Sequence, residues 1–391
     1  MRVLFNGVSA IKPRSGVGHT TANLHRALAE HFPNETFWLY PGETISRTAR
    51  RMIANSGGVT RRPGLGSNKT KTAGKPAAIC RWAYQLHLRA AARWGDFDLY
   101  HEPNFVPVRM HLPTVVTVHD LSVLRHPEWH PAERVRMYER DFARGIAAAK
   151  HVVVVTNAVR NEVIADLGLP PERVTAIHWG IGDEFRPQSA AGIHAVRARL
   201  GLPRFLLYVG TIEPRKNVRT LLRAFCDLPP AVREACPLVL AGGWGWKAEP
   251  ERELFAAAQS LGVRHLGYVA DADLPALYGA ADALLYPSFY EGFGLPPVEM
   301  LACGGAAIVS TADAVREVVG SHGAQLDPHD LQGWRDAMRR AITDPDWLAG
   351  LRRGGVAHAA RFTWANAART TFDVYQRVLG VAPTVASRRA A

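Results

Sequence analysis

The stretch Ala283–Ser310 reads ALLYPSFYEGFGLPPVEMLACGGAAIVS and has the pattern of a strand, a loop, a helix and a second strand. Its first four residues are apolar and end at Pro287, as in a buried strand. A glycine-rich loop follows, and Pro296 and Pro297 then stand where the first turn of a helix tolerates proline. The second strand is predicted over Ala306–Ser310. The stretch is therefore half of a doubly wound α/β unit, in which ligands bind at the carboxyl ends of the strands.

The loop suits a ligand that carries both phosphate and sugar. Free N–H groups at a helix start attract phosphate, and a glycine such as Gly294 allows a ligand close to the backbone. Glu291 and Glu299 bracket the loop, and their carboxylates can accept hydrogen bonds from sugar hydroxyls. A nucleotide sugar offers both groups. The alternative is a structural loop with two solvated glutamates, because a motif stays a hypothesis until its structural context is known.

The spacing Glu291-x7-Glu299 within EGFGLPPVE resembles the donor-site motif of retaining glycosyltransferases of family 4, which have the GT-B fold. The resemblance implies an α/β protein with two Rossmann-like domains facing each other across a cleft. It also implies that Glu291 holds the donor sugar and that Glu299 accepts hydrogen bonds from the ribose. The backbone of Phe293, Gly294 and Leu295 would lie against the donor.

The length of 391 residues is too great for one ordinary core and predicts two domains. The resemblance covers nearly the whole chain. It implies an acceptor-binding N-terminal domain over residues 1–185 and a nucleotide-sugar-binding C-terminal domain over residues 186–365. Residues 366–391 would form a helix that crosses back to the N-terminal domain, followed by a disordered tail.

The composition is that of a soluble globular protein, with 47% hydrophobic and 21% charged residues. No apolar run reaches the roughly 18 residues of a membrane span. The apolar part of the start, MRVLFNGVSAIKPRSG, is too short for a signal peptide, so we expect a cytoplasmic protein. The four cysteines form no CxxC pair, which argues against a zinc knuckle or a disulfide framework. We expect buried thiols at Cys80, Cys226, Cys236 and Cys303.

Positive charge is concentrated in residues 44–95. The whole chain carries a formal charge of +12, and no acidic residue occurs between Glu43 and Asp96. Such a block implies an anionic partner: lipid headgroups, a diphosphate or nucleic acid. No nucleic-acid recognition motif accompanies it, so we expect no nucleic acid. The basic residues are Arg47, Arg50, Arg51, Arg61, Arg62, Lys69, Lys71, Lys75, Arg81, Arg89 and Arg93.

The predicted helix 77–94 lies inside this basic block. Its apolar stripe includes Trp82, Ala83, Leu86 and Ala90, and basic residues fill the remainder. A basic amphipathic helix can lie on an anionic membrane, such as the inner face of the plasma membrane. The stripe can equally face the core and leave the basic side to solvent. The sequence favours neither alternative.

Two glycines open the first long helix. Gly16 and Gly18 can hold a phosphate at the helix start. A dinucleotide fingerprint, G-x-G-x-x-G, would need a third glycine where this chain has Thr21. A plain helix-start turn explains the pair about as well. The family resemblance implies a loop that faces the donor diphosphate.

His119 directly follows the predicted strand Thr114–Val118, and the carboxyl end of a parallel strand is a typical place for an active-site residue. A buried structural histidine is the alternative. The resemblance implies that His119 touches the donor sugar. Glu102 and Asn104 follow the preceding strand and would face the acceptor.

Arg215 and Lys216 lie between a predicted strand end and a helix start. Two fixed positive charges and free N–H groups would form a diphosphate cradle. The family's Arg/Lys pair falls here, although this chain has Thr211 where many members have arginine. Near Tyr268 and Val269 the resemblance implies contact between the backbone and the nucleotide base.

Asp271 and Asp273 form a D-x-D pattern that binds a metal in other glycosyltransferases. Here it precedes apolar residues at helical spacing, so helix capping is the favoured interpretation. GT-B enzymes usually need no donor-binding metal, and we expect neither a metal nor a cofactor.

These features predict a hexosyltransferase that moves a sugar, with retention, from a nucleotide sugar to a saccharide or a polyprenyl-diphosphate-linked acceptor in polysaccharide synthesis. The turn TIEPRKN, residues 211–217, resembles that of bacterial mannosyltransferases of surface polysaccharides, which favours GDP-mannose over a UDP-sugar. A nicotinamide-dependent sugar-nucleotide oxidoreductase is the alternative from another class. The missing third glycine and the lack of a Tyr-x-x-x-Lys pair argue against it. A non-catalytic nucleotide-binding protein is a further alternative.

Overall fold

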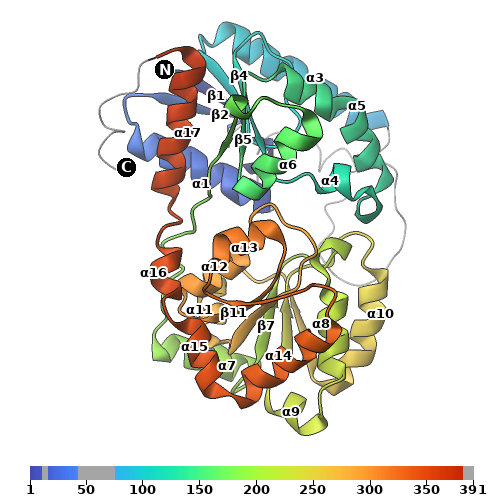
Figure 1. Cartoon of the computed structure of the whole chain (residues 1–391). Coiled ribbons are helices and arrows are strands. Elements are labelled where there is room, and N and C mark those ends of the chain that lie inside the picture. The colour runs from blue at the N-terminus through green and yellow to red at the C-terminus, as the bar shows by residue number, and fades with distance from the viewer. Residues whose placement is uncertain (11–15, 43–74, 382–391) are drawn as a thin grey trace.

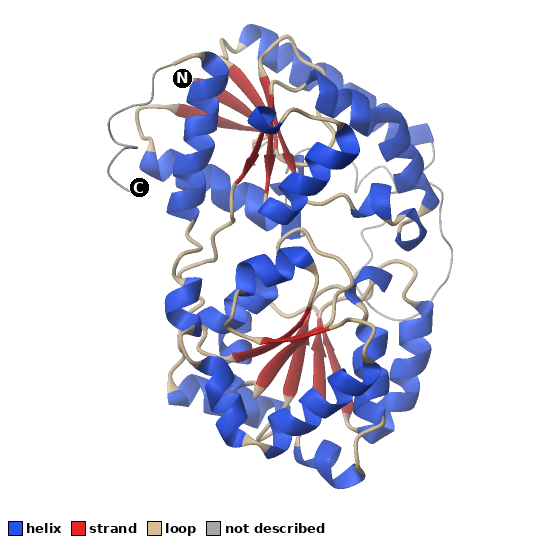
Figure 2. Ribbon diagram, in the orientation of Figure 1, coloured by secondary structure: helices blue, strands red, loops and turns tan. Residues whose placement is uncertain are grey.

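The computed structural model describes residues 1–10, 16–42 and 75–381 and has two α/β lobes (Figure 1). In each lobe a parallel sheet, six-stranded over the described residues, lies between helices, as Figure 2 shows. This confirms the predicted α/β architecture of two Rossmann-like domains. The tail and most of the basic block, residues 43–74, lie outside the described residues.

The N-terminal sheet has the strand order β2-β1-β3-β4-β5-β6. Its strands are almost continuous apolar runs because helices cover both faces of the sheet. They are β1 (Arg2–Asn6), β2 (Thr36–Tyr40), β3 (Leu99–Glu102), β4 (Thr114–Val118), β5 (His151–Val154) and β6 (Val174–Ala176). The main helices are α1 (Gly16–His31), α3 (Lys75–Trp94), α4 (Ser122–Arg125), α5 (Ala132–Ala148) and α6 (Asn157–Leu167).

The C-terminal sheet has the strand order β12-β11-β10-β7-β8-β9. Its strands are β7 (Leu206–Val209), β8 (Leu238–Ala241), β9 (Val263–Gly267), β10 (Ala283–Tyr286), β11 (Ala306–Ser310) and β12 (Ala324–Leu326). Its helices are α7 (Ala190–Leu200), α8 (Val218–Cys226), α9 (Pro230–Ala235), α10 (Glu249–Ala258), α11 (Leu274–Ala280), α12 (Leu295–Ala302), α13 (Asp313–Val319), α14 (Leu331–Thr343), α15 (Pro345–Arg352) and α16 (Gly355–Ala359).

Both sheets reverse their strand order beside their first strand. The reversal lies between β1 and β3 in one sheet and between β7 and β10 in the other. The carboxyl ends beside such a reversal form the ligand-binding edge of an open α/β sheet. Because β7 and β10 are neighbours, the loops that follow them must meet at this edge.

The last helix, α17 (Trp364–Leu379), returns to the N-terminal lobe and lies beside α1 (Figure 1). The Tyr375 hydroxyl lies 2.6 Å from His101 Nδ1, and the Phe372 ring stacks on Phe32 at 3.8 Å. A second connection runs in the opposite direction, and there the Ile181 N–H donates to the Phe362 carbonyl at 3.0 Å. Two chain segments therefore join the lobes on one side.

Two sequence expectations need correction. Asp273 does occupy the position before α11, but its side chain makes no capping hydrogen bond and lies 3.7 Å from Arg199 instead. Cys226 is half-buried rather than buried, whereas Cys236 and Cys303 are buried as expected.

The structure decides between the two orientations left open for the apolar stripe of α3. The stripe faces solvent, with Trp82 63% and Leu86 42% exposed. None of the described helices is long and apolar enough to cross a membrane.

Candidate active site

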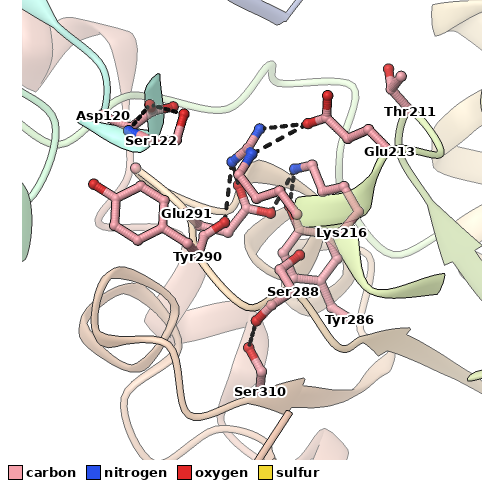
Figure 3. A network of polar contacts seen from close by, with 12 residues as sticks. Asp120, Ser122, Thr211, Glu213, Lys216, Tyr286, Ser288, Tyr290, Glu291 and Ser310 are labelled. Atoms are coloured by element: carbon pink, nitrogen blue, oxygen red, sulfur yellow. Dashed lines mark hydrogen bonds and ion pairs between the residues drawn. The ribbon is translucent and has the colours of Figure 1, made fainter. Parts of the chain in front are cut away.

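The loops after β7 and β10 bring three predicted residues together. Arg215 Nη1 donates to Glu291 Oε2 at 2.8 Å, and Lys216 Nζ donates to Glu291 Oε1 at 2.6 Å. Figure 3 shows Lys216 and Glu291 side by side above Tyr286 and Ser288. The predicted diphosphate cradle and the predicted sugar-binding carboxylate thus form one cluster.

Charges balance within this cluster before any ligand enters. Glu213, only 3% exposed, accepts hydrogen bonds from Arg215 at 3.0 and 3.2 Å, so two cations face two carboxylates. Burial alone would raise the pKa of Glu291, but Lys216 and Arg215 more than offset it and lower that pKa to about 2. Glu291 is therefore a carboxylate at neutral pH. Sequence reasoning missed Glu213, although it lies two residues before Arg215.

Hydrogen bonds hold the backbone of the loops that follow β7 and β10. Asn217 takes the left-handed conformation (φ 53°), and its side-chain amide donates to the carbonyls of Pro287 (3.1 Å) and Pro328 (2.8 Å). The Phe289 N–H donates to the Arg215 carbonyl at 2.9 Å, which ties one loop directly to the other. These bonds hold the charged side chains in place, which lowers the cost of ordering them around a ligand.

His119 enters the site from the N-terminal lobe. Its Nε2–H donates to the Pro103 carbonyl at 2.6 Å, and its ring lies 4.9 Å from the rings of Phe105 and Trp179. Burial lowers the pKa of His119 to about 4, so the ring is neutral at neutral pH. Because the hydrogen sits on Nε2, Nδ1 is an acceptor, and it has no partner within the described structure.

The charged cluster and His119 line one cleft of about 1960 Å³ between the lobes. Among the predicted site residues, Gly16, His119, Arg215, Lys216, Glu291, Phe293, Gly294, Leu295 and Glu299 line it, as do Glu102 and Asn104. Gly18, Tyr268 and Val269 are not among the lining residues: Gly18 is buried within α1, and Tyr268 is 71% exposed.

Helix α12 begins at the floor of the cleft. Gly294 precedes it with φ 98°, a conformation that favours glycine, and no side chain caps the first turn. Pro296 and Pro297 carry no N–H, so the groups that this helix start can offer an anion are the N–H groups of Gly294 and Leu295. Within the helix, Glu299 Oε2 accepts from the Tyr278 hydroxyl at 2.7 Å. Burial raises the pKa of Glu299 to about 7, with Glu184 and Asp271 adding to the effect.

Two family models match the chain: "Glycosyltransferase Family 4" over residues 14–185 and "Glycosyl transferases group 1" over residues 193–355. O-antigen chain mannosyltransferase B of Escherichia coli is 32% identical over 391 residues, which cover 96% of this chain and 100% of that protein. The chain belongs to glycosyltransferase family 4. The resemblance found in the sequence is thereby confirmed.

Two further comparisons give a partial relative and a structural neighbour of this glycosyltransferase. The serotype-specific mannosyltransferase WbdA of E. coli is 32% identical over 277 residues, which are 68% of this chain but only 34% of WbdA. Anabaena HepE, solved in complex with UDP and glucose, superimposes with a TM-score of 0.71 at 18% identity and covers 96% of this chain and 100% of its own. The structural likeness confirms the GT-B fold.

Side chains missed by sequence reasoning hold the two lobes of the glycosyltransferase together. Thr156 Oγ1, in the N-terminal lobe, donates to the Gly292 carbonyl of the C-terminal lobe at 2.9 Å. The carboxylate of Glu317, in α13, accepts from the backbone N–H groups of Asn157 (2.8 Å) and Ala158 (2.9 Å) at the start of α6. It also lies 2.6 Å from His178 Nε2. The donor loop is thus docked against the opposite lobe.

Proposed function

We propose that this glycosyltransferase moves mannose, with retention, from GDP-mannose to a saccharide or lipid-linked acceptor in polysaccharide synthesis. The observation that carries the proposal is the buried Arg215–Glu291–Lys216 cluster opposite His119. The full-length likeness to an O-antigen chain mannosyltransferase supports mannose as the sugar. A UDP-sugar is the alternative donor.

The departing nucleoside diphosphate gains negative charge as the glycosidic bond breaks. Lys216, Arg215 and the N–H groups of Gly294 and Leu295 would stabilise that charge, and fixed dipoles of this kind often make the largest contribution to catalysis. We propose that these groups supply the positive charge in place of a metal ion. Since the free cluster is neutral, the arriving diphosphate would also compete with Glu291 and Glu213 for the two cations.

Glu291 and His119 would bind hydroxyls of the donor sugar. Arg215 and Lys216 each donate to one oxygen of Glu291, and the hydroxyls of Tyr286 and Ser288 also interact with this carboxylate. A sugar hydroxyl would therefore take a remaining lone pair or replace one of these two hydroxyls. The free Nδ1 of His119 offers a further acceptor. We assign no carboxylate as a nucleophile and propose that the acceptor attacks from the face of the leaving group.

The proposed function is tested with the full chain, GDP-mannose and methyl α-mannoside as the acceptor, with UDP-glucose and GDP-glucose as competing donors. We expect release of GDP together with a new α-linked disaccharide, whose anomeric configuration is read by NMR. Thermal shifts in the presence of each nucleotide sugar give an independent ranking, because a bound donor raises stability. An inverted product, or no transfer from any nucleotide sugar, would contradict the proposal.

We expect donor binding to depend on pH through Glu299. If its carboxylate accepts from the ribose, the donor KM of the wild type should rise as the pH falls from 8 to 6, through the pKa of about 7. Glu299→Gln should raise the donor KM about tenfold at pH 8, the loss of roughly one strong hydrogen bond, and flatten its pH profile. The measurement is initial transfer rate against donor concentration at several pH values.

The same variant has a stability signature. The folded pKa lies above the ordinary 4.5, so the carboxyl destabilises the fold increasingly as the pH rises from 4.5 through about 7. Glu299→Gln should therefore not lower Tm at pH 8. Glu102 is the control, because burial also raises its pKa to about 7. A pH profile that persists in Glu299→Gln and vanishes in Glu102→Gln would overturn the assignment.

We also propose that α3 lies on an anionic membrane surface. Trp82, Leu86, Arg89 and Arg93 are exposed and share one helical face, while Leu88 and Ala92 on the other face are buried. The structure therefore argues against a core-facing stripe. Apolar side chains followed by arginines in an acid-free segment suit a bilayer with negative headgroups. Such a surface would bring a lipid-linked acceptor to the nearby cleft, which Arg89 also lines.

Removing the two exposed apolar side chains should detach the protein from membranes. We expect the double variant Trp82→Ser/Leu86→Ser to bind vesicles of phosphatidylglycerol and phosphatidylcholine at least about tenfold more weakly, because each side chain would bury apolar area in the bilayer. Co-sedimentation at low and high salt measures this. Val356→Ser, which removes a 41% exposed side chain from the other lobe, is the matched control. Equal binding by all three proteins would contradict the membrane surface.

A further inference from the structure

His130 is a buried histidine whose hydrogen-bonding groups are unused. It follows a short 3-10 turn, Pro127–Trp129, and lines the N-terminal wall of the cleft. The residue is only 4% exposed, yet neither Nδ1 nor Nε2 has a hydrogen-bond partner in the part of the chain that the structure describes. Buried polar groups are nearly always paired, so an unpaired imidazole at a cleft wall needs an explanation.

Of the other buried histidines, His119 lines the cleft and also has an unpaired Nδ1, whereas the two outside the cleft have hydrogen-bond partners. His101 contacts hydroxyls of Tyr375 and Thr117 at 2.6 and 2.8 Å, and His151, also 4% exposed, contacts Thr175 Oγ1 at 2.8 Å. Neither of these two lines the cleft. Unpaired imidazole nitrogens therefore occur at the cleft wall, and His130 is the histidine there with neither nitrogen bonded among the described residues.

His130 belongs to the N-terminal lobe and is near enough to the proposed diphosphate cradle to interact with Arg215. Its charged surroundings are Arg134 on α5, Asp120 beside His119, Arg215 in the cradle and Lys247 on the opposite lobe. Burial first, and then Arg134, lower the pKa of His130 to about 4. At neutral pH the ring is therefore uncharged, with one nitrogen that donates and one that accepts. A sugar hydroxyl can satisfy either one.

The cleft has room for a second substrate next to His130. Its volume of about 1960 Å³ exceeds the roughly 300–1,000 Å³ of a pocket for one small ligand. An aromatic ring is also close by: the centre of the Trp246 ring lies 6.0 Å from that of the His130 ring. The Arg134 guanidinium stacks over Trp246, 4.3 Å from the ring centre. Aromatic and planar polar side chains together suit a pyranose ring.

We propose that His130 binds hydroxyls of the acceptor saccharide and positions it against the donor. The inference rests on the proposed function and names a residue for its second substrate. In the free protein the two unpaired nitrogens of His130 destabilise the fold, and hydroxyls of the bound acceptor would supply their hydrogen-bond partners. His130 is thus a substrate-binding residue that lowers the stability of the free protein in exchange for acceptor affinity.

The test compares stability with acceptor affinity in His130→Phe. The apolar ring fills the site and removes both unpaired nitrogens, a change that is neutral or stabilising when no partner is lost. We expect Tm to stay equal or rise, and KM for methyl α-mannoside at saturating GDP-mannose to rise about tenfold or more, the loss of one or two hydrogen bonds. GDP release into water without acceptor should not change. His130→Gln, which keeps a donor and an acceptor, should restore part of the affinity.

His151→Phe is the matched control, because that side chain is equally buried but is hydrogen-bonded to Thr175 and does not line the cleft. It should lower Tm and leave the acceptor KM unchanged. A His130→Phe protein that loses stability and keeps the wild-type acceptor KM would overturn the inference. If phenylalanine prevents folding, His130→Leu provides the same comparison. Failure of the wild type to transfer mannose would instead refute the proposed function.

Discussion

Replacing Lys216 by methionine should lower kcat for sugar transfer by about 10²- to 10³-fold, the usual effect of removing one group that stabilises transition-state charge. Lys216 Nζ lies 2.6 Å from Glu291 Oε1 and 3.1 Å from the Tyr286 hydroxyl, in a position only 12% exposed. Methionine keeps the length of the side chain and removes its charge. Steady-state kinetics with GDP-mannose and methyl α-mannoside measure the change.

The fold should survive this substitution. Glu291 keeps its hydrogen bond to Arg215 Nη1 at 2.8 Å, so its carboxylate is not left without a partner. Removal of Arg215 would lower the stability of the fold more, because Arg215 donates hydrogen bonds to both Glu213 and Glu291. Both carboxylates are buried, and each would lose a positively charged partner. Lys216→Met is therefore the cleaner probe of catalysis, and circular dichroism with a thermal melt verifies that it remains folded.

Arg204→Met is the matched control for Lys216→Met. Arg204 also neutralises a buried carboxylate, Asp282, at 2.6 Å in the same lobe, but it does not line the cleft. Its loss should reduce Tm without changing kcat. If both variants lost stability alike and Lys216→Met retained wild-type kcat, the cluster would be a structural ion pair, and the leaving group would have to be stabilised elsewhere.

Much of the fold followed from the sequence because parallel strands buried on both faces are continuous apolar runs with clear ends. The strands Ala283–Tyr286, Thr114–Val118 and Ala306–Ser310 were predicted with the observed bounds. The meeting of Arg215 with Glu291 was inferred from the family motif alone. Its physical cause, the adjacency of β7 and β10, becomes visible only in the sheet order.

What the sequence could not supply depends on neighbours distant in the chain. The apolar stripe of α3 reads the same whether it faces core or solvent, and only the packing of Leu88 and Ala92 decides between them. Glu213 looks like any glutamate before a proline until Arg215 folds onto it. The contact of Glu317 with the start of α6 spans 160 residues and both lobes, and no local signal marks it.

Replacing Gly292 by alanine should hold the cleft open and reduce kcat/KM about 10²-fold, the cost of misplacing reacting groups by about 1 Å. Gly292 lies at the tip of the donor loop, where an added Cβ would overlap the carbonyl oxygen of His119 in the opposite lobe and come within 3.2 Å of Asp120 Cβ. Backbone atoms cannot yield as a flexible side chain does. The lobes must therefore separate, which breaks the hydrogen bond from Thr156 to the Gly292 carbonyl.

The substitution should change the distance between the lobes and leave the fold of each lobe intact. Gly292 does not have a positive φ, so alanine fits the backbone of its own loop, and Tm should change little. Small-angle scattering should show a larger radius of gyration, and saturating GDP-mannose should fail to reduce it. Gly243→Ala, where an added Cβ meets nothing within 4 Å, controls for the substitution itself. A Gly292→Ala protein as compact and as active as the wild type would mean that transfer does not need His119 and Glu291 at the separation seen here, and the roles assigned to both residues would fall together.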